Sequence, residues 1–145
     1  MVGLVEELAE YQRARAKCRL TAEQLHDALF REAPALFGHV AEVDGEVVGM
    51  ALWFLSFSTW RGTHGIYLED LYVRPSQRGS GLGNALLAEL ARECAANDYS
   101  RLEWTVLDWN ASAIGFYKSL GAVAMDEGTV FRLADRALTD LGTTG

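Results

Sequence analysis

The stretch that decides the fold of this chain reads Val73-Arg74-Pro75-Ser76-Gln77-Arg78-Gly79-Ser80-Gly81-Leu82-Gly83-Asn84. An apolar run ends at Val73, a basic loop with alternating glycines follows, and an apolar stripe of helical period begins at Leu82. Glycine lets the backbone approach a ligand closely, and the first N–H groups of a helix point at an anion. A strand, a glycine loop and a helix in this order therefore predict an α/β domain with a site for a phosphate-bearing ligand.

The spacing of the glycines excludes two common phosphate loops. A Walker A loop needs Lys followed by Ser or Thr after its last glycine, but Asn84-Ala85 stands there. A dinucleotide fingerprint needs Gly-x-Gly-x-x-Gly, whereas Gly79, Gly81 and Gly83 alternate. The loop alone leaves two interpretations. It is either an ordinary glycine-rich turn before a helix, or a phosphate-binding loop with the pattern Arg78-x-x-Gly81-x-Gly83.

Length and composition narrow the class of protein. The chain has 145 residues, half of them hydrophobic, which favours a single domain (1–145) with a core that needs no metal or disulfide. A net charge of −7 argues against nucleic-acid binding, which needs a basic surface, and agrees with a cationic substrate. Cys18 and Cys94 lack a CxxC or histidine partner, so we expect two reduced thiols and no metal site. We expect a cytoplasmic protein, because the acidic N-terminus does not resemble a signal peptide and no apolar run is long enough for a membrane.

Periodicity and turn signals predict the order of the elements. The capping-box spacing of Thr21 and Gln24 predicts the start of a second helix, which Pro34 ends. Asp44-Gly45 predicts the turn that joins two strands of a hairpin. In the strand before the glycine loop the apolar phase shifts between Leu68 and Leu71, which indicates a β-bulge. The expected elements are helices at 4–11, 21–33, 82–97 and 110–120, strands at 39–43, 46–57, 66–73 and 101–107, one or two strands within 123–133, and a frayed tail at 136–145.

Four segments in this order resemble one known family. They are Tyr67-Leu68-Glu69-Asp70-Leu71-Tyr72-Val73, the Arg78 loop, Val106-Leu107-Asp108-Trp109-Asn110 and Phe116-Tyr117-Lys118-Ser119-Leu120-Gly121-Ala122. The set resembles the GNAT superfamily of N-acetyltransferases, and within it the branch that acetylates spermidine, spermine and thialysine. The resemblance implies a three-layer α/β/α fold with a mixed, mostly antiparallel sheet. This sequence departs from the family pattern in two places. The family's first edge strand is missing before residue 4, and Gln12 follows Tyr11 where the family tends to carry an acidic residue.

The resemblance implies acetyl-CoA as acyl donor and assigns residues to it. Backbone groups of Leu71, Tyr72 and Val73 would bind it, although a strand buried on both faces also explains these residues. Arg78 would offset the phosphates with help from Arg74 or Lys118, both of which also fit a solvated basic loop. The remaining cofactor-binding candidates are Gly79, Ser80, Gly81, Leu82, Gly83, Asn84, Asn110 and Tyr117.

Amine acylation needs a base for the ammonium proton and an acid for the leaving thiolate. Glu69 is the candidate base, acting directly or through water, because a carboxylate amid apolar strand residues is otherwise costly; a solvent-facing or lysine-paired carboxylate is the alternative. Tyr117 is the candidate acid, since the family uses this tyrosine to protonate the coenzyme A thiolate; a core tyrosine is the alternative. Asn110 lies seven residues earlier, so both share one helix face.

The acceptor is predicted to be a primary amine of a small cation, such as a diamine, polyamine or lysine-like amino acid, attacked directly in a ternary complex. A homodimer follows from the resemblance only. Two other functions remain open: an acyl-CoA-binding module without catalysis, and acetylation of a protein or aminoglycoside amine. The substrate-binding candidates are Tyr11, Gln12, Glu69, Asp70, Glu103, Trp104 and Glu127.

Overall fold

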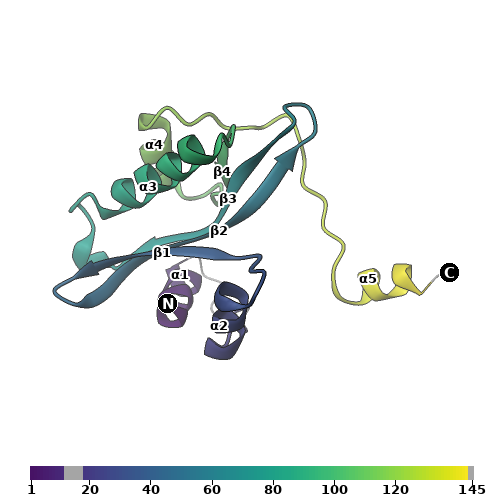
Figure 1. Ribbon diagram of the computed structural model, residues 1–145, viewed down its shortest axis with the longest axis horizontal. Coiled ribbons are helices and arrows are strands. Elements are labelled where there is room, and N and C mark those ends of the chain that lie inside the picture. Colours follow the sequence, from purple (N-terminus) through teal and green to yellow (C-terminus); the bar gives the residue numbers. More distant parts are fainter. Residues whose placement is uncertain (12–17, 144–145) are drawn as a thin grey trace. The chain divides into compact units, whose positions relative to one another are not determined.

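The computed structural model describes residues 1–11 and 18–143, and these separate into two compact units, Met1–Leu107 and Asp108–Gly145. Each unit is described by itself (Figure 1). Within unit 1 a four-stranded sheet has the order β1-β2-β3-β4. Its strands are β1 (Phe37–Val43), β2 (Glu46–Ser58), β3 (Thr63–Val73) and β4 (Leu102–Trp104). The pairs β1–β2 and β2–β3 are antiparallel and β3–β4 is parallel, which confirms the predicted mixed, mostly antiparallel sheet.

Helices cover both faces of this sheet, as the three-layer prediction requires. Helices α1 (Val2–Tyr11) and α2 (Ala22–Phe30) lie on one face, and α3 (Leu82–Asn97) lies on the other (Figure 1). The interface between the sheet and helices α1 and α2 buries one cluster, whose members are Leu4, Leu8, Leu25, Met50, Leu52 and Tyr72. Burial of such side chains contributes about 1.5–3 kcal/mol each. On the other side α3 buries the stripe Leu86, Leu87, Leu90 and Cys94.

The local signals read from the sequence have physical counterparts in unit 1. Asp44 and Gly45 both have positive φ, 52° and 81°, as a two-residue hairpin turn of the primed type requires. The capping box at the start of α2 is present, with Gln24 N–H donating to Thr21 Oγ1 over 3.2 Å. The second helix ends at Phe30, earlier than Pro34 suggested, and β4 is shorter than the predicted strand at 101–107.

Unit 2 holds α4 (Ala111–Ser119) and α5 (Asp135–Gly142). Gly121, with φ +93°, follows α4 as the predicted C-terminal cap. The strands predicted within 123–133 are wrong, because this stretch has no strand in the structure. Its apolar residues are left without the cross-strand neighbours that would stabilise such a strand. The stretch from 136, predicted as a frayed tail, contains most of α5.

Candidate active site

The predicted β-bulge in β3 is confirmed, and it falls at Glu69. Leu52 of β2 pairs with Asp70, but the next residue, Trp53, pairs with Leu68, so Glu69 has no partner in the register. An extra residue in one strand twists the strand and returns the following side chains to the opposite phase. The bulge therefore decides which face of the sheet each acidic side chain occupies.

The bulge brings acidic and aromatic residues to the face that α1 and α2 cover. Asp70 pairs with Leu52, which packs against those helices, and directly opposed residues share a face. Tyr67, three residues before Asp70, lies on the same face because the bulge adds one residue between them. The Tyr67 ring is tilted against that of Phe54, with ring centroids 5.1 Å apart, and the Tyr67 hydroxyl lies 2.6 Å from Thr105 Oγ1.

Glu69 and Asp70 differ in burial. Glu69 is exposed, whereas Asp70 is half-buried. Burial, together with the neighbouring Glu69 carboxylate, raises the pKa of Asp70 from 3.8 to about 6. The two adjacent carboxyl groups thus form an acidic pair in which the pKa of Asp70 is raised. Residues of this kind are candidates for proton transfer.

The glycine loop has the geometry of an anion site. Gly79 and Gly81 both have φ of +84°, a conformation that residues with a Cβ rarely adopt. Gly81 is the N-cap of α3 and supplies no side-chain cap, so the first N–H groups of that helix are left for another acceptor. A Cβ at Gly79, Gly81 or Gly83 would meet nothing within 4 Å. The loop is therefore open to a ligand that approaches its backbone, and its residues fit a diphosphate.

Arg78 and Arg74 play different parts beside this loop. The guanidinium of Arg78 lies over the ring of Tyr72, 5.5 Å from the centroid, and its Nε donates to Val73 O over 3.1 Å. Arg74 instead bridges Glu7 of α1 and Glu46 of β2, with N–O distances of 3.2 and 2.7 Å. Arg74 thus holds α1 against the β1–β2 turn. Arg78 is exposed and stays a candidate phosphate partner.

The backbone of β3 changes its pairing at the bulge. β4 pairs with β3 only at Ile66, Tyr67 and Leu68. Beyond the bulge, Leu71 and Val73 pair with β2 through Ala51 and Gly49, and none of the described strands pairs with their other edge. The predicted backbone contacts of Leu71–Val73 therefore fall where no described strand pairs with the outer edge of β3, and where Val73 O accepts from Arg78 Nε.

The predicted acid belongs to unit 2. Tyr117 lies in the last turns of α4 and is half-buried, and its ring centroid lies 5.6 Å from that of Phe116. Asn110 is the N-cap of α4, where its Oδ1 accepts from Ala113 N–H at 3.3 Å. The side-chain carbonyl of Asn110 thus caps α4, a structural role that the sequence analysis did not assign. Asparagine is a preferred N-cap residue, so the sequence could have indicated this role.

The predicted acceptor residues are dispersed. Glu103 pairs with Tyr67 across β3–β4 and forms an ion pair with Arg101 at 3.1 Å, while Trp104 pairs with Leu68. Glu127 is exposed in unit 2. Tyr11 ends α1, and Gln12 lies outside the described residues. The charge of Glu103 is therefore partly neutralised by Arg101.

Sequence reasoning named Tyr72 and Arg74 as cofactor-binding candidates but missed the contacts through which they shape the site. Tyr72 joins the core against α1 to Arg78, and Arg74 joins α1 to the hairpin turn. Tyr72 was predicted to act through its backbone, so the contact of its ring with Arg78 was not expected. The partners of Arg74 lie 67 and 28 residues away, so no local signal could find them. In the described part of the chain no group of acidic, histidine or cysteine side chains could hold a metal, and no helix has the length and apolarity of a membrane span.

Comparison with known proteins adds independent findings. The model of the acetyltransferase (GNAT) family matches residues 3–122. Thialysine N-epsilon-acetyltransferase of Bos taurus is 38% identical over 152 residues, which cover 97% of this chain and 89% of that protein. Spermidine/spermine N(1)-acetyltransferase-like protein 1 of Homo sapiens is 29% identical over 97% of this chain and 22% of its own length. Among solved structures, an integron cassette protein of V. cholerae has a TM-score of 0.82 at 28% identity, covering 99% of this chain and 90% of its own.

Proposed function

Because the chain belongs to the acetyltransferase (GNAT) family and is an N-acetyltransferase, we propose that it transfers acetyl from acetyl-CoA to a primary amine of a small cationic molecule. Members of this family generally use acetyl-CoA. The observation that supports this donor best is the glycine loop, whose positive-φ glycines open the first turn of α3 to an anion.

In the proposed complex the loop residues Arg78–Asn84 bind the diphosphate. The N–H groups at the start of α3 and the Arg78 guanidinium would offset its charge. The main-chain groups on the outer edge of Leu71–Val73, where no described strand pairs with β3, would bind the pantetheine arm as an added strand would. Asn110 would contact the same arm through its side-chain amide nitrogen, because its oxygen already caps α4.

The chemistry assigns a base and an acid. A protonated alkylamine has a pKa of about 10.4, so it must lose a proton before it can attack the thioester. We assign this proton to Glu69, directly or through water, with Asp70 beside it. The amine nitrogen then bonds to the carbonyl carbon and the C–S bond breaks. Tyr117 supplies the proton to the coenzyme A thiolate, and the second proton that the nitrogen loses on becoming an amide restores the Tyr117 hydroxyl.

The acidic face supports a cationic acceptor. The Glu69–Asp70 pair attracts one ammonium group, and Glu103, Trp104, Tyr11 and Glu127 are the candidates for contacts to the rest of the acceptor. The relatives named above are a thialysine N-epsilon-acetyltransferase and a spermidine/spermine N(1)-acetyltransferase-like protein. The proposed acceptors are therefore diamines, polyamines and lysine-like amino acids.

The deciding experiment measures thiol release from acetyl-CoA with a panel of amines. The panel contains thialysine, lysine, ornithine, putrescine, spermidine, an aminoglycoside and a lysine-containing peptide. We expect turnover with the first five. Turnover confined to the aminoglycoside or the peptide would reassign the acceptor. Thermal stabilisation by acetyl-CoA without any turnover would show a binding module and overturn the proposed reaction.

We also propose a homodimer in the cytoplasm. Four apolar side chains of the 123–133 stretch support an interface in unit 2, because they are largely exposed: Val123 78%, Met125 76%, Val130 90% and Phe131 92%. Light scattering on the purified chain tests the dimer. A monomer at micromolar concentration would exclude it under those conditions.

A further inference from the structure

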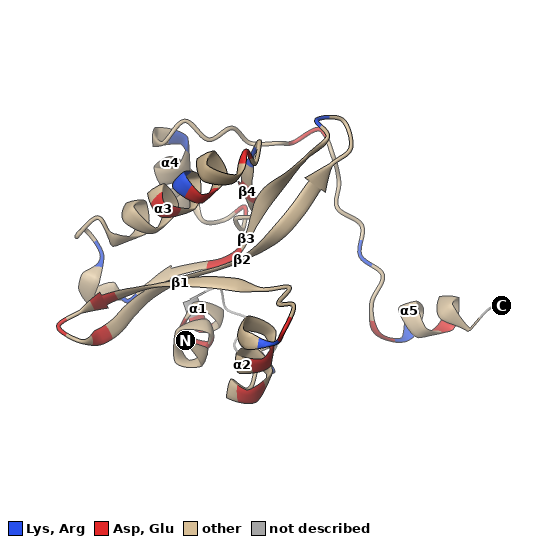
Figure 2. Cartoon of the chain, in the orientation of Figure 1, with Lys and Arg blue, Asp and Glu red and all other residues tan. Residues whose placement is uncertain are grey.

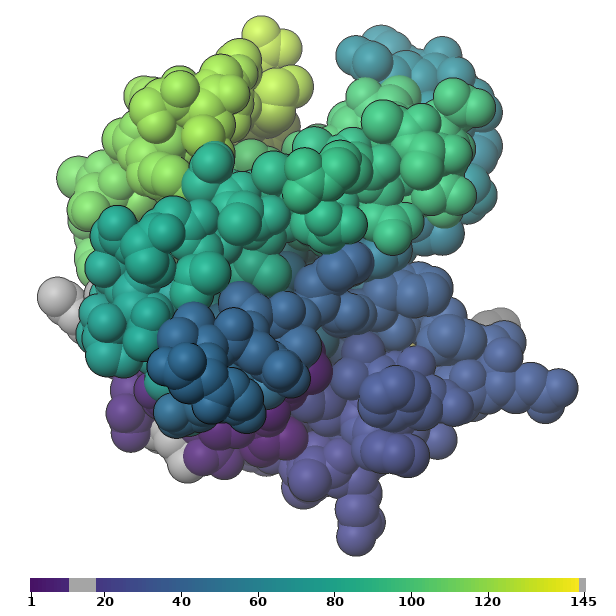
Figure 3. Space-filling model, turned by 60° about the vertical axis from the view of Figure 1, so that its left-hand side comes forward, coloured from purple at the N-terminus to yellow at the C-terminus, as the bar shows by residue number. Residues whose placement is uncertain are grey.

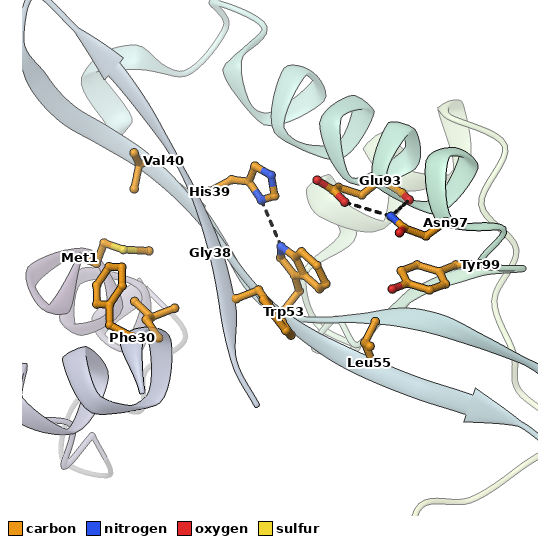
Figure 4. A pocket seen from close by; sticks show the side chains of 12 residues that line it. Met1, Phe30, Gly38, His39, Val40, Trp53, Leu55, Glu93, Asn97 and Tyr99 are labelled. Atoms are coloured by element: carbon orange, nitrogen blue, oxygen red, sulfur yellow. Dashed lines mark hydrogen bonds between the residues drawn. The ribbon is translucent and has the colours of Figure 1, made fainter. Parts of the chain in front are cut away.

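A row of aromatic and charged side chains crosses unit 1 on one face of the sheet. Figure 3 shows the helix layers of the two faces, with α1 and α2 in purple to violet and α3 in teal to green. Trp53 of β2 lies on the α3 face, where its Nε1–H donates to His39 Nδ1 over 3.1 Å (Figure 4). Successive side chains of a strand alternate, so Phe54, the next residue, points to the face of α1 and α2. The row begins with this residue.

The pairing of three strands defines the other members of the row. Tyr67 of β3 pairs with Phe54 of β2 on one side and with Glu103 of β4 on the other. Paired residues point to the same face of a sheet, so these three side chains are neighbours. Arg101, directly before β4, lies on this face too, because residues two apart in a strand share a face. A Cβ at Gly65 of β3 would lie 2.9 Å from Arg101 Cγ, which confirms that the Arg101 chain crosses β3 there.

The end of the row at β4 is an accessible pair of opposite charges. Arg101 Nε lies 3.1 Å from Glu103 Oε1, and both side chains are 38% exposed. This Nε atom is buried and, among the described residues, makes no hydrogen bond of good geometry. A guanidinium has five N–H donors and a carboxylate has two acceptor oxygens, so a single contact leaves most of them for a ligand. The pair therefore offers one positive and one negative binding group side by side.

The middle of the row is aromatic, and its other end is acidic. The Tyr67 hydroxyl is satisfied by Thr105 Oγ1 at 2.6 Å, and the half-buried rings of Tyr67 and Phe54 lie 5.1 Å apart. Their faces are an apolar surface that suits methylene groups. Beyond Tyr67 along β3 come Glu69 and Asp70, which are red on this strand in Figure 2. The row thus joins the proposed base to the charge pair at β4.

The length of the row fits a lysine-like amino acid. Tyr67 and Asp70 are three residues apart on β3, so a rise of about 3.3 Å per residue separates the two ends by roughly 10 Å. The five bonds from the side-chain nitrogen of lysine to its α-carbon span roughly 6 Å when extended. The α-carboxylate, the α-ammonium and the long side chains of Arg101 and Glu103 cover the remaining distance. An amino acid can therefore reach both ends at once.

We propose, on the basis of the proposed acetyl transfer, that Arg101 and Glu103 form the subsite for the α-carboxylate and α-ammonium of an amino-acid acceptor. Arg101 binds the carboxylate through two N–H donors, and Glu103 binds the ammonium. The rings of Phe54 and Tyr67 contact the methylene groups, and the side-chain amine lies at Glu69. A diamine places no carboxylate beside Arg101, whose charge repels the second ammonium. The subsite thus selects amino acids over the diamines that lack only the carboxylate.

Three acceptors that differ by one group each test the subsite in the full chain. Lysine carries both α groups, cadaverine lacks the carboxylate, and 6-aminohexanoate lacks the α-ammonium. We expect kcat/KM for lysine to exceed that for either analogue by roughly tenfold, mainly through KM, because each analogue loses one charged contact. If cadaverine equals or surpasses lysine, the role of Arg101 is wrong. If 6-aminohexanoate does so, the role of Glu103 is wrong.

Two variants assign each group of the acceptor to its partner. Arg101→Gln should raise the KM for lysine and 6-aminohexanoate about tenfold without raising that for cadaverine, so the preference for lysine disappears. Glu103→Gln should raise the KM for lysine and cadaverine without raising that for 6-aminohexanoate. Arg101→Lys keeps the charge but loses the two-donor geometry, so it should retain part of the preference. A purely structural role would change all three acceptors together, and that result would overturn the proposal.

Arg92→Gln is the matched control, because Arg92 forms a similar pair with Glu89 at 2.8 Å on α3. It should leave the three KM values unchanged, and a loss equal to that of Arg101→Gln would show a general effect of charge and overturn the subsite.

Calorimetry separates this inference from the proposed function. It measures the Kd of lysine and of cadaverine with coenzyme A bound, so it needs no turnover. A preference for lysine that Arg101→Gln abolishes, without turnover of any amine, would support the subsite and reject the reaction. Turnover of amines without this preference would support the reaction and reject the subsite.

Discussion

The two units of the molecule hold their functional residues in different ways. In unit 1 the glycine loop and the bulge at Glu69 are backbone features attached to a buried core. In unit 2 the side chain of Tyr117 lies on a nine-residue helix, and none of the described residues of that unit is buried. The proposed cofactor site is therefore built from local backbone geometry in unit 1. The proposed acid depends on one side chain in the less buried unit.

The largest expected effect separates chemistry in unit 2 from binding in unit 1. Tyr117→Phe keeps the ring and removes the proton of the proposed acid. We expect kcat to fall by roughly 100-fold, within the range for general acid–base catalysis, while the KM for acetyl-CoA stays unchanged. Steady-state kinetics with thialysine measure both constants. Phe116 is the neighbouring ring, and Phe116→Leu is the control that should change kcat little. An unaltered kcat in Tyr117→Phe would remove Tyr117 from the mechanism.

The next effect distinguishes the two carboxyl groups of unit 1. If Glu69 is the base, Glu69→Gln should lower kcat/KM by about 10- to 100-fold and move the pH optimum upward, because the reaction then depends on free amine. If Asp70 is the base, the opposite shift is expected. Removal of the Glu69 charge would lower the pKa of Asp70 from about 6, and the acidic limb of the profile would move down.

The pH dependence of kcat/KM, measured from pH 5 to 9 in both Glu69→Gln and Asp70→Asn, decides between these cases. We expect the upward shift in Glu69→Gln. A downward shift with activity retained would transfer the role to Asp70. A profile identical to that of the natural chain in both variants would exclude the pair as the proton acceptor.

The burial of Asp70 also predicts a pH-dependent stability. Its pKa rises from 3.8 in the unfolded chain to about 6 in the folded protein, mainly through burial. Its carboxyl is protonated in both states below pH 3.8, and the unfolded chain ionises first as the pH rises. Ionisation of Asp70 therefore lowers the free energy of unfolding as the pH rises, and this effect is complete only above pH 6. As the pH rises from 4 to 7.5, the free energy of unfolding of Asp70→Asn should therefore increase by roughly 1–3 kcal/mol relative to that of the natural chain.

Urea unfolding of both proteins at the two pH values measures this difference. Comparing each variant with itself cancels the pH-independent cost of burying the asparagine amide. Glu69→Gln, the exposed neighbour, is the control and should gain less. A stability difference that does not change with pH would show that Asp70 ionises normally in the folded protein.

The sequence predicted what local geometry determines. Asp44-Gly45 encodes its turn, the alternating glycines encode the start of α3, and the shifted phase around Glu69 encodes the bulge. It did not predict features that depend on distant partners. The 123–133 stretch has strand-like composition but forms no strand, and the ion pairs of Arg74 join residues 67 and 28 positions away. The greater burial of Asp70 relative to Glu69 likewise follows from how the bulge meets the α1–α2 face. Such contacts arise only in the folded chain.

The smallest expected effect tests the backbone character of the cofactor site. Gly83 lies in the first turn of α3 without positive φ, and a Cβ there meets nothing within 4 Å. Gly83→Ala should therefore leave the free protein as stable or raise its stability by roughly 0.5 kcal/mol, since alanine favours the helix. The added methyl group would meet a diphosphate that approaches the backbone, so we expect the Kd for acetyl-CoA to rise about tenfold.

A matched glycine in unit 2 sharpens this comparison. Gly115 lies within α4, also without positive φ and with open space around its Cβ position. Gly115→Ala should stabilise by a similar amount and leave the Kd for acetyl-CoA unchanged. Calorimetry and thermal unfolding of the two variants give both quantities. Equal affinities in the two variants would mean that the ligand does not approach the Gly83 backbone, and the proposed diphosphate site would then lose its main support. A gain in stability joined to a loss of affinity, confined to Gly83, is the result that only close approach of a ligand explains.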